Sequence, residues 1–416
     1  MIYKNQVFSR PYSMTRIIRN HIIVAILLVS GAAEAAAKPR NLFHELLNKS
    51  EEETSRRIEA AWRQFREGDK KNQRLFFEQA DGTAYIADVG NGDVRSEGMS
   101  YGMMISVQLD RHDDFDQLWK WVQRHMRHAE GPRRGYFAWQ CTYDGKQIDS
   151  GSASDGEEWI AMALMFASHR WDTSEHRPYG DAAKELLTEM RTKPTQDGVT
   201  SIFDNDKYQV VFAPNPVANK LTDPSYHLPA FYELWAQWDS SADGRKFWAA
   251  CAKKSREFFR KAAHSETGLM PEYSEFDGSP YRDTRFGEGK GDFRFDAWRT
   301  LSNVALDYAW WHADPWQVKQ SHRVLRFLAT QSPSPVNEYT LSGRRLSESP
   351  SSGLIAMAAT AGLAAGSELA TPFVQRLWDS PTPEGKWRYY NGLIHMLGLL
   401  QAGGRFQAID KPTPKE

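Results

Sequence analysis

Large apolar residues recur along this chain with the period of an α-helix, and this pattern constrains its fold more than any other feature. The residues lie at i, i+3, i+4 and i+7, so each set occupies one face of a helix. The segments 354–365 and 393–400 are apolar over a wider arc, and we expect them to be buried on more than one side. The clearest stripes are Phe115, Leu118, Trp119, Val122 and Met126; Ile160, Ala163, Leu164, Ala167 and Trp171; Phe231, Leu234, Trp235 and Trp238; and Trp298, Leu301, Val304, Ala305, Tyr308 and His312.

Signals for β-strands are short and fall at 136–143 and 208–212. No linker rich in Pro, Gly and Ser divides the sequence, and single Gly and Pro residues separate the helical stretches instead. The pattern predicts about ten to twelve helices in one domain spanning 38–416. We therefore expect an all-α toroid of helical hairpins with short β-strands in its loops. Function is expected in the long loops 193–223 and 268–292.

The N-terminus has the pattern of a secretory signal peptide. Arg16 and Arg19 precede a short apolar run at 22–29, and small residues follow up to Ala37. The run is too short to anchor the protein in a bilayer. We expect residues 1–37 to be removed and the protein to be exported to the periplasm or the medium, with no membrane segment after cleavage.

The charge of the chain is balanced, with 52 Lys and Arg against 53 Asp and Glu. This balance argues against a nucleic-acid partner, because phosphate binding needs a clustered basic excess. The chain has 15 Trp, 16 Tyr and 21 Phe. Most of the Trp residues belong to helical stripes and are predicted to be core, and a small subset of aromatic residues in loops could hold sugar rings. Cys141 and Cys251 are far apart in sequence and are expected to be buried free thiols. A monomer is expected.

Three acidic residues lie among Gly, Ser and aromatic residues at predicted helix starts: Glu97, Asp155 and Asp296. Each alone could simply cap a helix or complement its dipole. In a ring of hairpins, however, alternate helices start at the same end, so the three acids can converge on one cleft. Hydrolysis of a glycosidic bond needs one protonated and one ionised carboxyl group. The three acids therefore suggest a glycosidase.

The residues around these acids resemble the sequence signatures of glycoside hydrolase family 8. Ala-Ser-Asp-Gly-Glu at 153–157, with Trp171 downstream, is similar to the family's Ala-[Ser/Thr]-Asp-[Ala/Gly]-Asp stretch, and Glu157 replaces the second Asp. The segment 96–103 resembles the family's general-acid segment, and 295–299 resembles its general-base segment. The order and spacing agree over essentially the whole chain after residue 37.

This resemblance implies an (α/α)6 barrel and hydrolysis with inversion at the anomeric carbon. It assigns Glu97 as the general acid, Asp296 as the general base that activates water, and Asp155 as the residue that holds and distorts the sugar. An inverting pair stands roughly 6.5–9.5 Å apart, so that a water molecule fits. The family's chemistry needs no metal, and the sequence has no ligand spacing typical of a metal site. No metal or cofactor is expected.

The candidate sugar-binding residues lie near these acids or in loops. Trp139 resembles the stacking Trp of the family. Arg299, one turn after Asp296, could orient that carboxylate or bind a sugar hydroxyl. Tyr208, Tyr226 and Tyr390 are further candidates. For each of these except Trp139, a packing role is at least as well supported by the sequence.

Three loop segments, 212–216, 222–229 and 389–393, resemble the xylan-directed branch of the family, and within it the reducing-end xylose-releasing exo-oligoxylanases. The expected partner is a xylo-oligosaccharide or xylan, and the expected reaction releases xylose from the reducing end. In that subgroup, a Leu-His-Pro loop before a Gly-Leu-Ile-Ala helix closes the cleft beyond one sugar. Here the helix is present at 353–356, but Ser-Pro-Ser-Ser at 349–352 precedes it. An endo-β-1,4-xylanase or endoglucanase therefore remains an alternative.

Two other classes of protein share part of this pattern. A non-catalytic sugar-binding protein on a helical toroid would have the aromatic residues but would not need Glu97 and Asp296 together. A polysaccharide lyase can use the same type of barrel, with a Tyr or His base in a basic cleft. Removal of residues 1–37 lowers the formal charge of the chain from −1 to −4, which argues against a basic cleft.

Overall fold

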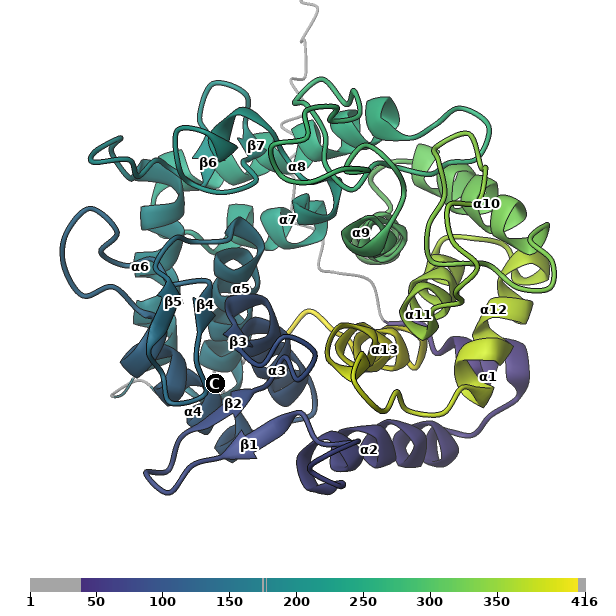
Figure 1. Cartoon of the computed structure of the whole chain (residues 1–416), viewed down its shortest axis with the longest axis horizontal. Coiled ribbons are helices and arrows are strands. Elements are labelled where there is room, and N and C mark those ends of the chain that lie inside the picture. Colours follow the sequence, from purple (N-terminus) through teal and green to yellow (C-terminus); the bar gives the residue numbers. More distant parts are fainter. Residues whose placement is uncertain (1–38, 174–175, 177, 411–416) are drawn as a thin grey trace, which may run out of the picture. The chain divides into compact units, whose positions relative to one another are not determined.

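The helices of this chain alternate between an outer and an inner ring, as Figure 1 shows. The computed structural model describes residues 39–173, 176 and 178–410, and the predicted signal peptide lies outside them. After α1 (Leu42–Leu47), the outer ring contains α2 (Glu51–Glu67), α4 (His112–Trp121), α6 (Pro178–Thr192), α8 (Ala242–Ala262), α10 (Trp316–Ala329) and α12 (Ser367–Asp379). The inner ring contains α3 (Ser96–Gln108), α5 (Ser154–Trp171), α7 (Pro229–Trp238), α9 (Arg299–Trp311), α11 (Ser352–Thr360) and α13 (Arg388–Ala402).

The two rings differ in how their helices are buried, and the sequence explains the difference. Outer helices bury one stripe each: α2 buries Ile58, Ala61, Trp62 and Phe65 at helical spacing and leaves its charged face to solvent. Inner helices are buried over most of their surface, and every residue of α11 from Gly353 onwards is buried. The expectation that the apolar segments near 354 and 393 are buried on more than one side is therefore confirmed.

Small residues let the inner helices approach one another closely. A Cβ atom added to Gly398 of α13 would lie 2.8 Å from the Cβ of Ala356 in α11, which is too close for two carbon atoms. The first inner helix, α3, packs against both α5 and the last inner helix, α13, so the inner ring closes. Because each hairpin runs outward and back, all inner helices begin at the same end of the barrel.

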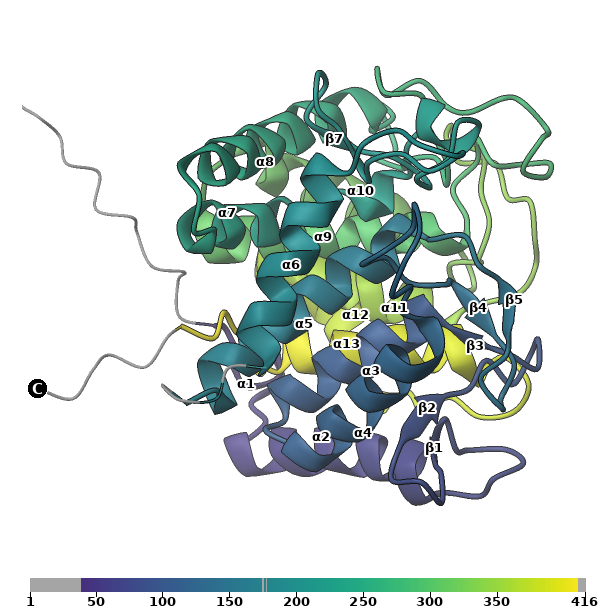
Figure 2. The same cartoon turned by 90° about the vertical axis from the view of Figure 1, so that its left-hand side faces the viewer.

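The β-strands are short and belong to the loops. They form the pairs β1 (Phe76–Glu78) with β2 (Ala84–Ile86) and β6 (Phe203–Asp204) with β7 (Gln209–Val210), and a three-stranded sheet in the order β3 (Val94–Arg95), β4 (Gln140–Cys141), β5 (Gln147–Asp149). All pairings are antiparallel, with Val94 opposite Cys141 and Phe203 opposite Val210. Figure 2 shows β3, β4 and β5 gathered at one end of the barrel. The two predicted strand segments contain β4 and β7.

The core contains most of the tryptophans, as the helical stripes predicted. Among the largest fully buried side chains are Trp62, Trp121, Trp235, Trp248 and Trp298. Burial of a large apolar side chain stabilises a fold by roughly 1.5–3 kcal/mol, so these rings account for much of the stability of the barrel. Cys141 and Cys251 are buried free thiols, as expected. Within the described part of the chain, no helix is both long enough and apolar enough to cross a membrane.

Candidate active site

A large cavity opens at the end of the barrel where the inner helices begin. Its volume is about 1000 Å³, at the upper end of the range for ligand sites and large enough for more than one sugar ring. The walls come from the starts of α3, α5 and α13 and from the long loops between helices. The lining includes Arg95, Glu97, Trp139, Asp155, Phe212, Tyr226, Tyr273, Phe295, Asp296, Trp387, Tyr389 and Tyr390. The loops predicted to carry function, 193–223 and 268–292, do contribute to its walls.

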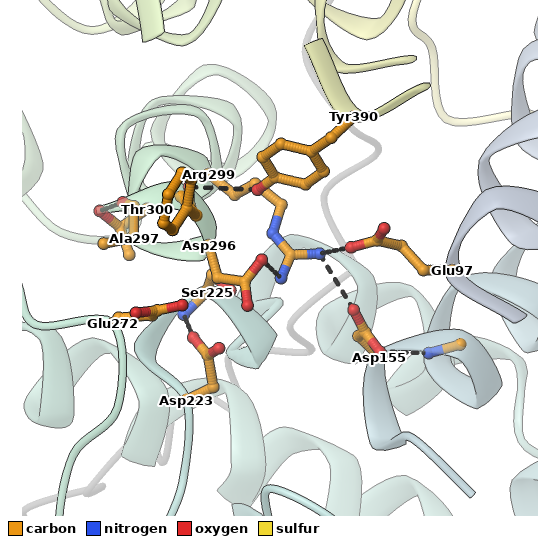
Figure 3. A network of polar contacts seen from close by, with 12 residues as sticks. Glu97, Asp155, Asp223, Ser225, Glu272, Asp296, Ala297, Arg299, Thr300 and Tyr390 are labelled. Atoms are coloured by element: carbon orange, nitrogen blue, oxygen red, sulfur yellow. Dashed lines mark hydrogen bonds and ion pairs between the residues drawn. The ribbon is translucent and has the colours of Figure 1, made fainter. Parts of the chain in front are cut away.

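The three acids singled out in the sequence meet at this cavity. Glu97 is the second residue of α3, and Asp155 is the second residue of α5. Asp296 lies in the short 3-10 helix Phe295–Trp298 that runs into α9. Each acid therefore stands at the start of an inner helix, and the common orientation of these helices brings the carboxyl groups together (Figure 3).

Two glycines make this convergence possible. A Cβ atom on Gly156 would lie 2.4 Å from the Oγ of Ser96, so only glycine lets the starts of α3 and α5 come this close. A Cβ atom on Gly98 would lie 2.5 Å from the ring of Tyr389. Gly98 therefore allows the start of α13 to approach α3 and place Tyr389 beside the first acid.

Arg299 links the three acids through one guanidinium group. Its Nη1 atom donates to Glu97 Oε2 at 3.2 Å and to Asp155 Oδ2 at 3.0 Å. Its Nη2 atom forms an ion pair with Asp296 Oδ1 at 3.1 Å. Nη1 also donates to the hydroxyl group of Tyr101. Figure 3 shows the guanidinium lying between the three carboxyl groups, so a single positive charge faces three acids.

The Glu97 carboxyl group is held largely in its protonated form. Burial raises the pKa of Glu97 to about 8, the charge of Arg299 opposes this, and Asp155 and Asp296 add to it. Removal of a carboxylate from water is unfavourable, and one nearby cation compensates only part of that loss. Tyr389 donates a hydrogen bond to Glu97 Oε1 at 3.1 Å. Glu97 is therefore oriented and protonated at neutral pH, which are the properties of a general acid.

Asp155 is more deeply buried than Glu97, with 3% of its surface exposed. Burial raises its pKa, and the charge of Arg299 opposes this increase. The backbone N–H of Gly156 donates to Asp155 Oδ1 at 2.9 Å, while Oδ2 accepts from Arg299. Both oxygens are thus fixed in direction at the wall of the cavity.

Two further acids, Asp223 and Glu272, lie on the Asp296 side of the network (Figure 3). Asp223 is fully buried, and its Oδ1 accepts from the backbone N–H of Ser225 at 2.7 Å. Burial raises the pKa of Asp223, and Asp296 adds to the effect. Burial also raises the pKa of Glu272 to about 7, again with a contribution from Asp296, although Lys290 donates to it at 2.9 Å. Sequence reasoning did not select either acid, because their loops carry no periodic pattern.

The candidate sugar-binding residues divide into those at the cavity and those away from it. Trp139, Tyr226 and Tyr390 line the cavity. The Arg95 guanidinium lies 5.5 Å from the centre of the Trp139 ring, which braces that ring from one side. Tyr390 donates to the backbone carbonyl of Phe295 at 3.1 Å and thereby fixes the residue before Asp296.

Neither Tyr208 nor Arg299 is positioned to contact a sugar directly. Tyr208 does not line the cavity: it is 40% exposed in the turn between β6 and β7, and its ring packs against Phe247 of α8. A positive φ of 55° turns the chain at this position, so the side chain is directed to the outer ring. Arg299 is 4% exposed, and its guanidinium is occupied by the three acids. This position fits the other role that the sequence suggested for Arg299, which is to orient a carboxylate.

The cavity is also lined by aromatic residues that the sequence did not single out as sugar-binding candidates, namely Phe212, Tyr273, Phe286, Phe295, Trp298, Trp387 and Tyr389. Most lie in loops or at helix starts, where no periodic pattern separates them from packing residues. Among the residues that the structure describes, no group of three or more His, Cys, Asp or Glu side chains is arranged to hold a metal ion.

Acids gathered at the starts of the inner helices, beside aromatic rings in one cavity, are the arrangement expected of a glycosidase. The chain belongs to the glycosyl hydrolases of family 8, whose sequence model matches residues 59–404. It is 40% identical over 360 residues to the reducing-end xylose-releasing exo-oligoxylanase Rex8A of Paenibacillus barcinonensis, an alignment that covers 86% of this chain and 93% of that protein. The predicted family is thus confirmed.

Solved structures agree with this assignment. Rex8A in complex with xylose superposes with a TM-score of 0.84 at 39% identity, covering 90% of this chain and 98% of that chain. A family 8 xylobiose complex from Teredinibacter turnerae superposes with a TM-score of 0.85 at 40% identity and with the same coverage. The expected (α/α)6 barrel is confirmed.

Proposed function

We propose that this glycoside hydrolase cleaves the β-1,4-xylosidic bonds of xylo-oligosaccharides with inversion and releases xylose from the reducing end. The observation that supports the reaction type is that Glu97 and Asp296 contact two different nitrogens of the Arg299 guanidinium group, while burial keeps Glu97 protonated. The names of the most similar relatives support the substrate and the position of cleavage.

In this proposal, Glu97 is the general acid and Asp296 is the general base. Glu97 gives its proton to the glycosidic oxygen as the bond from that oxygen to the anomeric carbon breaks. A water molecule attacks the same carbon from the opposite face and gives a proton to Asp296. One water is consumed, and proton exchange with solvent restores both carboxyl groups. Glu97 and Asp296 contact different nitrogens of the guanidinium group, which therefore lies between them. An inverting pair needs a separation of roughly 6.5–9.5 Å to admit the attacking water.

We assign Asp155 and Arg299 to holding the reacting groups. Asp155 faces the cavity with both oxygens fixed, so it can accept hydrogen bonds from hydroxyls of the sugar on the glycone side of the bond and stabilise a distorted ring. Arg299 fixes the directions of the three carboxyl groups. Trp139, Tyr226 and Tyr390 offer aromatic faces to the sugar rings.

Digestion of xylotetraose carrying oxygen-18 at its reducing-end carbon tests the activity and the position of cleavage together. The proposal predicts labelled xylose and unlabelled xylotriose as the initial products. Unlabelled xylose with labelled xylotriose would place the cut at the other end. Substantial xylobiose would refute exo action, and no cleavage at all would refute the substrate.

Endo-xylanase action is a second candidate, and one observation favours it. Ser349, Pro350 and Ser351 line the cavity, so the segment before α11 presents only small side chains to the cleft. An open cleft would let a chain continue in both directions and be cut internally. In the same labelled digestion, comparable amounts of xylobiose and xylotriose at the first time points would favour this candidate.

We also propose that residues 1–37 form a signal peptide, that 38–416 is the catalytic domain, and that the exported enzyme is a monomer. The sequence pattern at the N-terminus supports export. Mass spectrometry of the exported protein should give an N-terminus close to Lys38, and light scattering should give the mass of one chain. A retained N-terminus or a dimer mass would contradict these two points.

A further inference from the structure

An exposed tryptophan stands at the rim of the active-site cavity. Trp387 is 65% exposed, more than any other large apolar residue of the described chain, yet it lines the same cavity as Glu97 and Asp296. Isolated exposed apolar residues are common on protein surfaces. What distinguishes this ring is its position on the cleft and the way in which its backbone is held.

The residue after Trp387 anchors it to the barrel. Arg388 is 2% exposed, and its guanidinium donates only to backbone carbonyls within the described residues. These acceptors are Lys70 O at 3.1 Å, Lys71 O at 3.0 Å, Arg74 O at 2.9 Å and Gly385 O at 2.8 Å. Burial of a cation without a carboxylate partner is unfavourable. The hydrogen bonds of the Arg388 guanidinium to four carbonyl groups offset this cost and fix the start of α13. The backbone N–H of Gly385 donates a further hydrogen bond to Asn72 O at 2.7 Å.

The loop that faces Trp387 is also fixed and carries polar groups. A Cβ atom on Gly90 would lie 3.4 Å from Cε3 of Trp387, so the loop is in contact with the indole. Asp88 accepts from the backbone N–H of Gly90 at 3.0 Å and from Asn91 Nδ2 at 2.8 Å. Lys386 Nζ lies 4.7 Å from the centre of the indole ring. Asn91 and Lys386 also line the cavity, so hydrogen-bonding groups flank the exposed ring.

We propose that Trp387, flanked by Asn91 and Lys386, forms an additional sugar-binding subsite that takes a pyranose unit distant from the scissile bond. The axial C–H bonds of a β-xylopyranose ring form an apolar face that stacks on an indole, while its equatorial hydroxyls reach polar groups at the edge. This inference rests on the proposed function for the identity of the sugar. It deepens that function, because an outer subsite favours longer chains over short ones.

A sugar fits this site better than a protein partner does. A stable protein interface buries about 800 Å² on each partner and has an apolar centre. Here a single indole lies beside a lysine and an asparagine at the edge of a cavity. A polysaccharide that already occupies the cavity would pass over the ring without a separate docking surface.

Chain-length dependence of cleavage tests the subsite. The kcat/KM values of the wild type, Trp387→Ala, Trp387→Phe and the control Ile148→Ala are compared on β-1,4-linked xylo-oligosaccharides of increasing length. Ile148 is 53% exposed and does not line the cavity. We expect Trp387→Ala to match the wild type on the shortest substrate and to lose roughly three- to tenfold on chains that reach the ring. Trp387→Phe should recover part of this loss, and Ile148→Ala should show none.

The outcomes separate the subsite from the proposed function. If the wild type cleaves no xylo-oligosaccharide, the proposed function fails. The subsite is then tested by the same comparison of kcat/KM on cello-oligosaccharides of increasing length. If the wild type cleaves them and Trp387→Ala gives the same length profile, the subsite is wrong. A uniform loss at all lengths would indicate a structural role and overturn it as well. A wild-type dimer that Trp387→Ala converts to a monomer would mean that the ring covers a second copy, which also overturns the proposal.

Discussion

Glu97 retains a raised pKa although Arg299 Nη1 lies 3.2 Å from its Oε2 atom. Burial of the carboxyl group outweighs the attraction of the cation, and the neighbouring acids Asp155 and Asp296 act in the same direction as burial. The same guanidinium forms an ion pair with Asp296. One arginine thus contacts both acids, and the pKa of Glu97 stays raised, as a general acid requires.

The first prediction concerns the pH dependence of kcat/KM. Burial raises the pKa of Glu97 to about 8, so the proton it must donate is present below that value and is lost as the pH rises through it. We expect kcat/KM on xylo-oligosaccharides to fall by tenfold per pH unit above about 8. In Glu97→Gln this alkaline limb should be absent, and activity should survive only on substrates whose leaving group needs no protonation. A wild-type alkaline limb near pH 5 would contradict the assignment.

The second prediction concerns Arg299. Its charge lowers the pKa of Glu97, so its removal in Arg299→Gln should move the alkaline limb to higher pH. Because Asp296 also loses its ion pair, kcat should fall by about a hundredfold or more. Arg299→Lys keeps the positive charge but lacks the planar guanidinium group that contacts all three acids. In this variant we expect the alkaline limb of the pH profile to stay at the same pH and kcat to be reduced. An unchanged pH profile in Arg299→Gln would show that Arg299 does not act through Glu97.

The third prediction concerns Asp296. Asp296→Asn keeps the shape of the side chain but cannot take a proton from water, so turnover should be abolished. Calorimetric titration should give a Kd for xylo-oligosaccharides close to that of a Glu97→Gln protein, because the cavity walls are unchanged. Near-normal turnover in this variant would remove Asp296 from the role of general base.

The fourth prediction concerns the approach of α3 to α5. Gly156→Ala would place a Cβ atom 2.4 Å from Ser96 Oγ, and relief of this overlap must push the starts of the two helices apart. We expect a loss of about 1–3 kcal/mol in the free energy of unfolding, as for other overpacked sites, together with a fall in kcat. Gly366→Ala is the control, because its nearest neighbour would be His322 Nε2 at an ordinary 3.5 Å. Equal stability of the two variants would refute the steric argument.

The fifth prediction concerns Glu157, which replaces an aspartate of the family signature. Glu157 is fully buried, and burial raises its pKa to about 8. An acid whose pKa is raised on folding adds stability at low pH, and this contribution is lost as the pH rises from about 4.5 towards 8. In Glu157→Gln the amide can still accept the hydrogen bond from Phe137 N–H, which measures 3.1 Å in the wild type. Urea unfolding should therefore show a smaller decrease in stability from pH 5 to pH 8 in this variant than in the wild type.

The sequence allowed the fold and the position of the site to be predicted, because both depend on repeated local patterns. Apolar stripes gave the helices, and Glu97, Asp155 and Asp296 were placed at helix starts that the ring brings together. The contacts of Arg299 with all three acids were not predicted, since they depend on side chains from three different helices. The same reason explains why Asp223 and Glu272 were missed. Tyr208 was selected as a loop aromatic, but the turn at this residue directs it away from the cavity.

The central claim is that Glu97 and Asp296 act together in a single displacement by water. Proton NMR of a fresh xylotetraose digestion tests this claim most directly. The cleaved anomeric carbon remains on one product, and the anomer in which that product first appears reports the stereochemistry. We predict that this xylotriose appears first as the α-anomer and only later equilibrates to the mixture. Initial appearance of the β-anomer would indicate retention through a covalent intermediate and would contradict the account.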